Sequence, residues 1–222
     1  MNNLKIYSYI VRNDSGFAPN PFWDYCTLAI DQALIRQIIR VGDWVVGLKE
    51  ISKKTEDHYM IFAMQVTEKL TFKEYWSNPR FNVKRPDFTI EEEIFRVGDN
   101  IYEPSGDGFI QHYSYHSRDY FDSDDTWHKQ KHDDIQGKFV LVADRKFYHY
   151  FGRDAFTLPS VELTDLLYCD VGHKCIADPE VSKEFIDFIN QLKKNGKIGF
   201  IAPPENWSEN DESYIQCILK DD

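Results

Sequence analysis

Apolar and β-branched residues occur in short runs along the chain, separated by charged or turn-forming segments. Runs of roughly four to eight such residues are typical of buried β-strands. We therefore predict strands at 4–11, 44–48, 59–66, 138–143, 147–151 and 198–201, with shorter strands near 101–102 and 109–113.

Two segments in the first half of the chain follow a helical pattern instead. Apolar residues spaced three and four apart predict a short helix over about 33–40. Thr71, with Glu74 three residues later, has the spacing of a capping box. A second helix is therefore expected to begin at Thr71 and to end near residue 77.

The longest helix is predicted at 179–194. Asp178 is suited to the N-cap and Pro179 to the first helical position. Gly196 follows the last turn, where glycine commonly ends a helix. The apolar stripe of this helix consists of Val181, Phe185, Phe188, Ile189 and Leu192.

The intervening segment, residues 80–137, is the least regular and is rich in Asp, Gly, His and aromatic residues. No internal repeat and no clear linker divides the chain. We therefore expect residues 1–222 to form a single α+β domain with a mixed, mostly antiparallel sheet. A C-terminal helix and extension are expected from about residue 178, with a last apolar segment at 214–219.

The composition indicates a folded domain and narrows the range of partners. Hydrophobic residues make up 42% of the 222 residues and aromatic residues 15%, enough to bury a core. The net charge is −11, whereas proteins that bind duplex nucleic acid draw affinity from Lys and Arg on phosphates. We therefore expect no strong duplex binding, although a small pocket could still hold a single base or a free nucleotide.

No segment has the pattern of a targeting signal or a membrane span. The first ten residues, MNNLKIYSYI, lack the basic flank and long apolar run of a secretion signal. No apolar run approaches the roughly 20 residues that a membrane span needs. The four cysteines form no CxxC pair. These features predict a cytoplasmic protein with reduced thiols and no membrane partner.

Residues 16–26, GFAPNPFWDYC, differ from an ordinary surface loop. Two prolines flank Asn20 and stiffen the backbone around it. The other notable side chains are four aromatic rings and a carboxylate: Phe17, Phe22, Trp23, Tyr25 and Asp24. Such a loop would suit one wall of a pocket for a planar, polar ligand. Packing of the same rings into the core is the simpler interpretation of this stretch taken alone.

Four of the seven histidines lie in the irregular segment, at 112, 116, 128 and 132. His116, Ser117 and Asp134 have the residue types of an acid, base and nucleophile set, although the sequence does not show that they meet. His128 and His132 would share one face of a helix, but a solvated polar face accounts for that spacing and we expect no metal site. Cys26 is a lone thiol for which a buried, inert role is the simpler interpretation.

Val-Gly-Asp occurs twice, at 41–43 and at 97–99. Both are explained as turns, in which glycine supplies unusual backbone angles and aspartate caps the turn. The phosphate-binding patterns GxGxxG and GxxxxGK[ST] are both absent. Hydrolysis of nucleoside triphosphates by a P-loop is therefore not expected, and no cofactor is implied.

Several segments occur in an order that resembles one protein family. They are GFAPNPF at 16–22, TLA at 27–29, Ile35-Arg36, VGDWVVG at 41–47, FKEYW at 72–76, VGDNIY at 97–102, His116-Ser117 and FVLVADRKFYHYFG at 139–152. Over about residues 4–175 the chain resembles the second type of nucleotide-modification-associated domain, a bacterial and phage family found near genes for DNA base modification. The resemblance implies a role in the synthesis, recognition or processing of modified nucleotides, and it favours a pocket wall at residues 16–26.

The order of strand, helix and Gly-Asp turn is also similar to that of PUA-like domains, which read flipped bases in an aromatic pocket. This analogy concerns layout alone. A small PUA-like β-barrel flanked by helices is therefore the alternative fold.

Three functional hypotheses follow. In the first, the chain binds a modified nucleobase or nucleotide in a phage or bacterial DNA-modification or defence context. Its candidate ligand-binding residues offer rings for stacking or polar edges for hydrogen bonds: Phe17, Asn20, Phe22, Asp24, Asp43, Trp44, Asp99 and Tyr102. In the second, it is an enzyme that hydrolyses or modifies a nucleotide, using His116, Ser117 or Asp134. In the third, it is a protein-interaction subunit.

Overall fold

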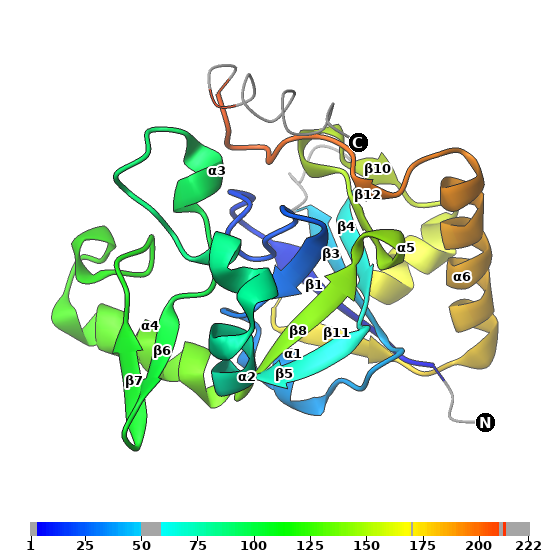
Figure 1. Cartoon of the computed structure of the whole chain (residues 1–222). Coiled ribbons are helices and arrows are strands. Elements are labelled where there is room, and N and C mark those ends of the chain that lie inside the picture. The colour runs from blue at the N-terminus through cyan, green and yellow to red at the C-terminus, as the bar shows by residue number, and fades with distance from the viewer. Residues whose placement is uncertain (1–3, 50–58, 170, 209–210, 212–222) are drawn as a thin grey trace. The chain divides into compact units, whose positions relative to one another are not determined.

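The computed structural model describes residues 4–49, 59–169, 171–208 and 211 (Figure 1). These residues form two compact units, and each unit is assembled from separate stretches of the chain. The first unit lies within 1–14, 39–67 and 143–206, and the second within 15–38, 68–142 and 207–222. The apolar segment predicted at 214–219 lies outside the described residues.

The first unit is built on a mixed sheet. Its strands are β1 Ile6–Val11, β3 Trp44–Lys49, β4 Tyr59–Gln65, β9 Tyr148–Tyr150, β10 Phe156–Thr157, β11 His173–Ile176 and β12 Gly199–Phe200. In the described residues they follow the order β11-β1-β3-β4-β9-β12, and β10 pairs with β4. β1 runs parallel to β3 and β9 parallel to β12, whereas the other pairs are antiparallel.

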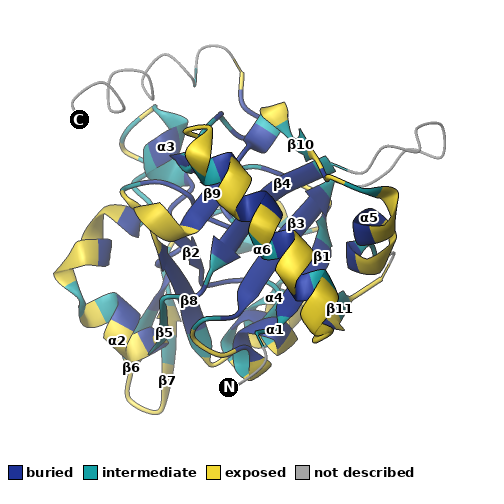
Figure 2. Ribbon diagram, turned by 90° about the vertical axis from the view of Figure 1, so that its right-hand side faces the viewer, coloured by how far each residue is buried: buried dark blue, intermediate teal, exposed yellow. Residues whose placement is uncertain are grey.

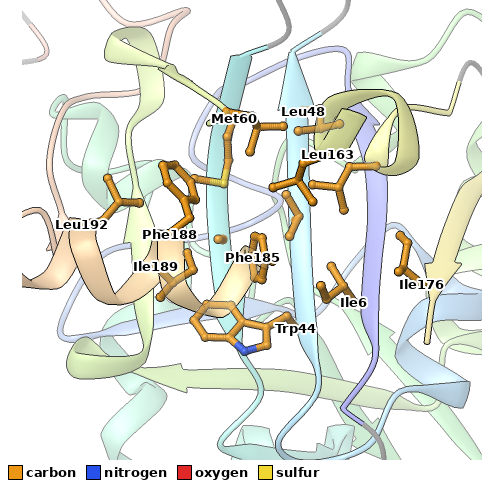
Figure 3. Close-up of a cluster of buried hydrophobic side chains, with 14 of the residues drawn as sticks. Ile6, Trp44, Leu48, Met60, Leu163, Ile176, Phe185, Phe188, Ile189 and Leu192 are labelled. Carbon is orange, nitrogen blue, oxygen red and sulfur yellow. The ribbon is translucent and has the colours of Figure 1, made fainter. Parts of the chain in front are cut away.

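Two helices pack on one face of this sheet, α5 Val161–Leu167 and α6 Pro179–Lys194. Asp178 caps α6 by accepting hydrogen bonds from two backbone N–H groups of its first turn. The apolar stripe of α6 lies on the sheet, where the ring centroids of Phe185 and Trp44 are 5.4 Å apart (Figure 3). The opposite side of α6 is exposed (Figure 2), as expected of an amphipathic helix.

The second unit combines short helices with a smaller sheet. Its helices are α1 Ala33–Ile38, α2 Phe72–Ser77, α3 Glu93–Arg96 and α4 Asp124–Gln136. Its strands are β2 Tyr25–Leu28, β5 Glu68–Thr71, β6 Tyr102–Ser105, β7 Gly108–Gln111 and β8 Phe139–Asp144. β2, β8 and β5 form a three-stranded sheet in that order, and β6 and β7 form an antiparallel hairpin. Short 3-10 turns occur at Pro79–Lys84 and Arg118–Tyr120 here, and at Arg145–Phe147 and Gly152–Asp154 in the first unit.

The α+β class and the mixed, mostly antiparallel pairing predicted from the sequence are confirmed. Across the described ranges the sheets remain open, so the PUA-like barrel that we considered as an alternative is not formed. Thr71 and Glu74 form the expected capping box of α2, and α6 has the predicted bounds. In that part of the chain, the helices are too short or too polar to cross a lipid bilayer.

Candidate functional site

Asp134 is the centre of a buried polar network in the second unit. It lies on α4 and is fully buried. Its Oδ2 accepts from the Tyr102 hydroxyl at 2.9 Å and lies 2.8 Å from Nδ1 of His116. Its Oδ1 accepts from the backbone N–H of Asp31 at 2.8 Å and from Nε2 of Gln130 at 3.2 Å. Four donors thus satisfy both oxygens, which fixes the orientation of the carboxylate.

His116 is the member of this network that reaches the surface, with 14% of its side chain exposed. A carboxylate only accepts hydrogen bonds, so Nδ1 of His116 is the donor and Nε2 lies on the opposite edge of the ring. Within the described residues Nε2 has no hydrogen-bond partner. The rings of Phe17 and Phe121 flank the imidazole, with centroids 4.9 and 6.1 Å from its own. We refer to His116, Asp134, Tyr102 and these two rings as the His116 site.

The surroundings of His116 favour its protonated form. Burial lowers the pKa of His116, but the hydrogen bond and the charge of Asp134 outweigh it, and the pKa lies above its ordinary value. The carboxylate of Asp31 acts in the same direction. Burial also raises the pKa of Asp31, and the positive charge of His116 opposes that shift. His116 therefore holds a proton to a higher pH than a free histidine does.

Arg36, on α1, supports this network as a fully buried cation. Its guanidinium donates to the backbone oxygens of Asp31 and Asp134, each at 2.6 Å, and to that of Phe139 at 2.8 Å. Burial lowers the pKa of Arg36 to about 10. Gly137 leaves room for the guanidinium, because a Cβ at that position would lie 2.2 Å from its central carbon. Arg36 thereby joins α1, α4 and β8 beneath the site.

A second buried network holds the proline-containing loop at 16–26. The Lys84 ammonium donates to three backbone oxygens of this loop and to Oδ1 of Asn20, over distances of 2.5 to 3.1 Å. The Asn20 amide donates to two further backbone oxygens, at 2.8 and 3.0 Å. Burial lowers the pKa of Lys84 to about 8 and raises the pKa of Cys26, which is fully buried. The loop is thus fixed from inside, and Phe17 is held beside His116.

Both aspartates of the Val-Gly-Asp turns are bonded to protein donors. In the second unit Asp99 accepts from the hydroxyls of Thr27 and Tyr75, at 2.8 and 2.6 Å. Burial raises the pKa of Asp99. In the first unit Asp43 accepts from two backbone N–H groups, at 2.9 and 3.1 Å. The bond from Arg40 matches the turn-capping role predicted for Asp43, whereas Asp99 is bonded to side chains that are distant in sequence.

Asp43 and Trp44 fall in the first unit, where Trp44 lies in the hydrophobic core. The other predicted site residues fall in the second unit: Phe17, Asn20, Phe22, Asp24, Asp99, Tyr102, His116, Ser117 and Asp134. The structure brings four of them together, namely Phe17, Tyr102, His116 and Asp134.

The remaining residues of that group have other neighbours. Phe22 stacks on Trp207 with ring centroids 5.2 Å apart, and Asp24 is exposed. The Ser117 hydroxyl accepts from the backbone N–H of Ser114 at 2.9 Å. Ser117 is therefore held in a local turn and is not hydrogen-bonded to the neighbouring imidazole in the described structure.

His128 and His132 both lie on exposed positions of α4. His132 accepts a hydrogen bond at Nε2 from the Gln136 amide, 2.7 Å away. Among the residues that the structure describes, no group of three or more His, Cys, Asp or Glu side chains could hold a metal ion.

Three members of the network were not predicted from the sequence: Arg36, Asp31 and Gln130. Arg36 carried a usable signal, because it follows Ile35 on the apolar side of a predicted helix, where a charge requires buried partners. Asp31 and Gln130 carried none, since an acidic residue in a turn and an amide on a polar helix are ordinary.

Comparison with protein-family models gives a match over nearly the whole chain. A model described as nucleotide modification associated domain 2 matches residues 3–211. The matched region continues well past residue 175, where the resemblance in sequence motifs ended. Searches of curated proteins and of solved structures gave no match.

Proposed function

The chain belongs to the nucleotide modification associated domain 2 family, as its motifs predicted, and on this premise we propose that it binds a modified nucleobase or nucleotide at the His116 site. The family description associates the domain with nucleotide modification. A phage or bacterial DNA-modification or defence setting is part of the proposal. The observation that carries it is a partly exposed imidazole that Asp134 orients through Nδ1 and that contacts two aromatic rings.

The chemistry of the site suits such a ligand. Bases and phosphates both carry acceptor atoms, and a protonated imidazole offers them an N–H at Nε2. Phe121 is half-buried and offers apolar ring surface for a planar base, whereas Phe17 is buried and supports the imidazole from within. Asn20 would contribute by fixing the loop that carries Phe17, because its amide and carbonyl already bind protein partners.

Calorimetric titration with deoxynucleoside monophosphates and their base-modified counterparts tests this proposal. His116→Gln removes the imidazole and is expected to weaken binding by about tenfold or more, the effect of losing a charge-assisted hydrogen bond. His128→Gln changes an exposed histidine of the same unit and should bind as the wild type does. Wild-type affinity in His116→Gln, or no binding of any ligand in the panel, would contradict the proposal.

A second candidate function is an enzyme that acts on the bound nucleotide. The Asp134–His116 pair has the arrangement of a general base, in which the carboxylate orients the ring and Nε2 takes the proton. With Ser117 bonded to Ser114, the group that His116 activates would be a water molecule or a hydroxyl of the ligand. Turnover that is lost in His116→Gln would favour the enzyme, and binding without turnover would favour recognition.

A further inference from the structure

A hollow of about 530 Å³ lies in the second unit and is lined by residues of the start of α2, the β6–β7 hairpin and the last turn of α4. Figure 1 shows where these three elements lie in the chain. Its described lining includes none of the residues of the His116 site. Its volume falls within the roughly 300–1,000 Å³ of small-molecule pockets. We refer to it as the hairpin groove.

Part of the lining of the hairpin groove is apolar. It consists of Phe72, Pro104, Phe109 and Ile135. The rings of Phe72 and Phe109 meet edge to face, with centroids 5.4 Å apart. Phe72 is buried, but Phe109 is only half-buried and so has ring surface available. A flat aromatic ring is the group that such a surface holds best.

The lining of the groove also carries positive charge. It includes Lys73 and Lys138, together with His132 and the acidic residue Asp107. The chain as a whole has 26 basic residues against 37 acidic ones, so this local excess of cations is the reverse of the average. Both lysines are exposed, and neither forms an ion pair with the described residues. Unpaired ammonium groups beside apolar side chains are suited to an anion attached to a ring.

We infer that the hairpin groove is a second ligand site, which binds a planar aromatic anion with its ring against Phe109 and its anionic group on Lys73 and Lys138. The shape and charge of the groove carry the inference as far as an aromatic anion. The choice of a nucleoside monophosphate within that class rests on the proposed function.

The groove and the His116 site share two structural elements of the second unit. His132 and Ile135 line the groove, whereas Asp134 on the same helix bonds to His116. The Phe72 ring lies 5.6 Å from the ring of Tyr102, whose hydroxyl donates to Asp134. The two sites are therefore linked through one helix and through one pair of packed aromatic rings.

The test uses deoxyadenosine monophosphate and, for comparison, deoxyadenosine, which has the ring without the charge. Binding to the full chain is followed by NMR, with the Ile135 methyl signals reporting the groove and the His116 ring signals reporting the other site. Deoxyadenosine monophosphate is expected to shift the Ile135 signals saturably. Deoxyadenosine should do so with about tenfold lower affinity, because the contacts to the ammonium groups are lost.

Variants assign the binding to the groove. Lys73→Gln combined with Lys138→Gln should lower the affinity for the monophosphate to that for the nucleoside, and Phe109→Ala should weaken both. Lys129→Gln alters an exposed lysine of α4 outside the groove and should have no effect. Failure of the monophosphate to shift the Ile135 signals would overturn the inference. Wild-type affinity in both the double lysine variant and Phe109→Ala would also overturn it. In His116→Gln the shifts at Ile135 should persist. Loss of binding at the His116 site can therefore be distinguished from loss of binding at the groove.

Discussion

His149 is fully buried in the first unit, with its Nδ1 2.5 Å from the backbone oxygen of Lys197. Burial lowers the pKa of His149 to about 4. In the unfolded chain the same side chain takes up a proton below about pH 6.5. Between these two values the unfolded state binds the proton and the native state does not. The contribution of neutral His149 to stability is therefore complete above about pH 6.5 and is lost as the pH falls toward 4.

The expected loss at His149 is on the order of 3 kcal/mol of unfolding free energy across this window. His149→Gln removes the titration, so its unfolding free energy should fall less steeply between pH 7 and pH 4.5 than that of the wild type. Urea unfolding at a series of pH values measures the difference. His128→Gln, at an exposed position, should keep the wild-type slope. Parallel pH profiles for the wild type and His149→Gln would show that His149 does not titrate in this way.

At the scale of elements, the packing at the C-terminal end of α4 depends on a glycine, Gly137. Gly137 has ordinary helical backbone angles, so alanine would not strain the backbone. Its Cβ would, however, collide with the Arg36 guanidinium, which bonds to α1, α4 and β8. Gly137→Ala is therefore expected to cost about 1–3 kcal/mol of stability through overpacking.

Thermal and urea unfolding of Gly137→Ala measure this cost. Gly108→Ala, in β7, is the matched control, because the nearest atom to its Cβ would be 3.9 Å away. Its effect should stay within about 0.5 kcal/mol. Equal effects of the two substitutions would mean that the guanidinium moves aside without loss of its bonds.

The elements that the sequence predicted well carry their own end signals. α6 has Asp178 and Pro179 at its start, and α2 has the Thr71 capping box. α4 was not assigned as a helix because its thirteen residues lack an apolar stripe, and its capping box pairs Ser123 with Thr126 where Glu or Gln is usual. Capping residues define the ends of α2 and α6 from the sequence alone. A polar helix such as α4 instead depends on contacts that only the folded chain supplies.

Two residues of the His116 site were predicted from the sequence, but the contact between them was not. His116 and Asp134 were both named from the sequence, but they are 18 residues apart and meet only because α4 lies beside the loop that follows β7. The partners of the buried cations Arg36 and Lys84 could not be predicted, since most of them are backbone oxygens, which any residue supplies. Spacing in sequence does not encode contacts of that kind.

At the scale of the whole molecule, each unit depends on segments that are distant in sequence. Residues 68–142 contain His116 and Asp134 but lack the loop that binds Lys84 and the helix that carries Arg36. Expressed alone, this fragment would leave the Lys84 ammonium buried without acceptors, and we expect it to be unfolded. Circular dichroism and amide NMR, with the full chain for comparison, test this expectation. Cooperative unfolding of the isolated fragment would contradict it.

The interleaving of the two units also has a consequence for synthesis on the ribosome, which releases the chain from its N-terminus. β1 emerges first, but the sheet to which it belongs is not covered until α6 places Phe185 over Trp44. The Arg36 and Lys84 networks need nothing beyond Phe139 and can form earlier. The nascent chain can therefore form the parts of the second unit that precede residue 143 while the apolar strands of the first unit are still uncovered. These strands are where a ribosome-associated chaperone would bind.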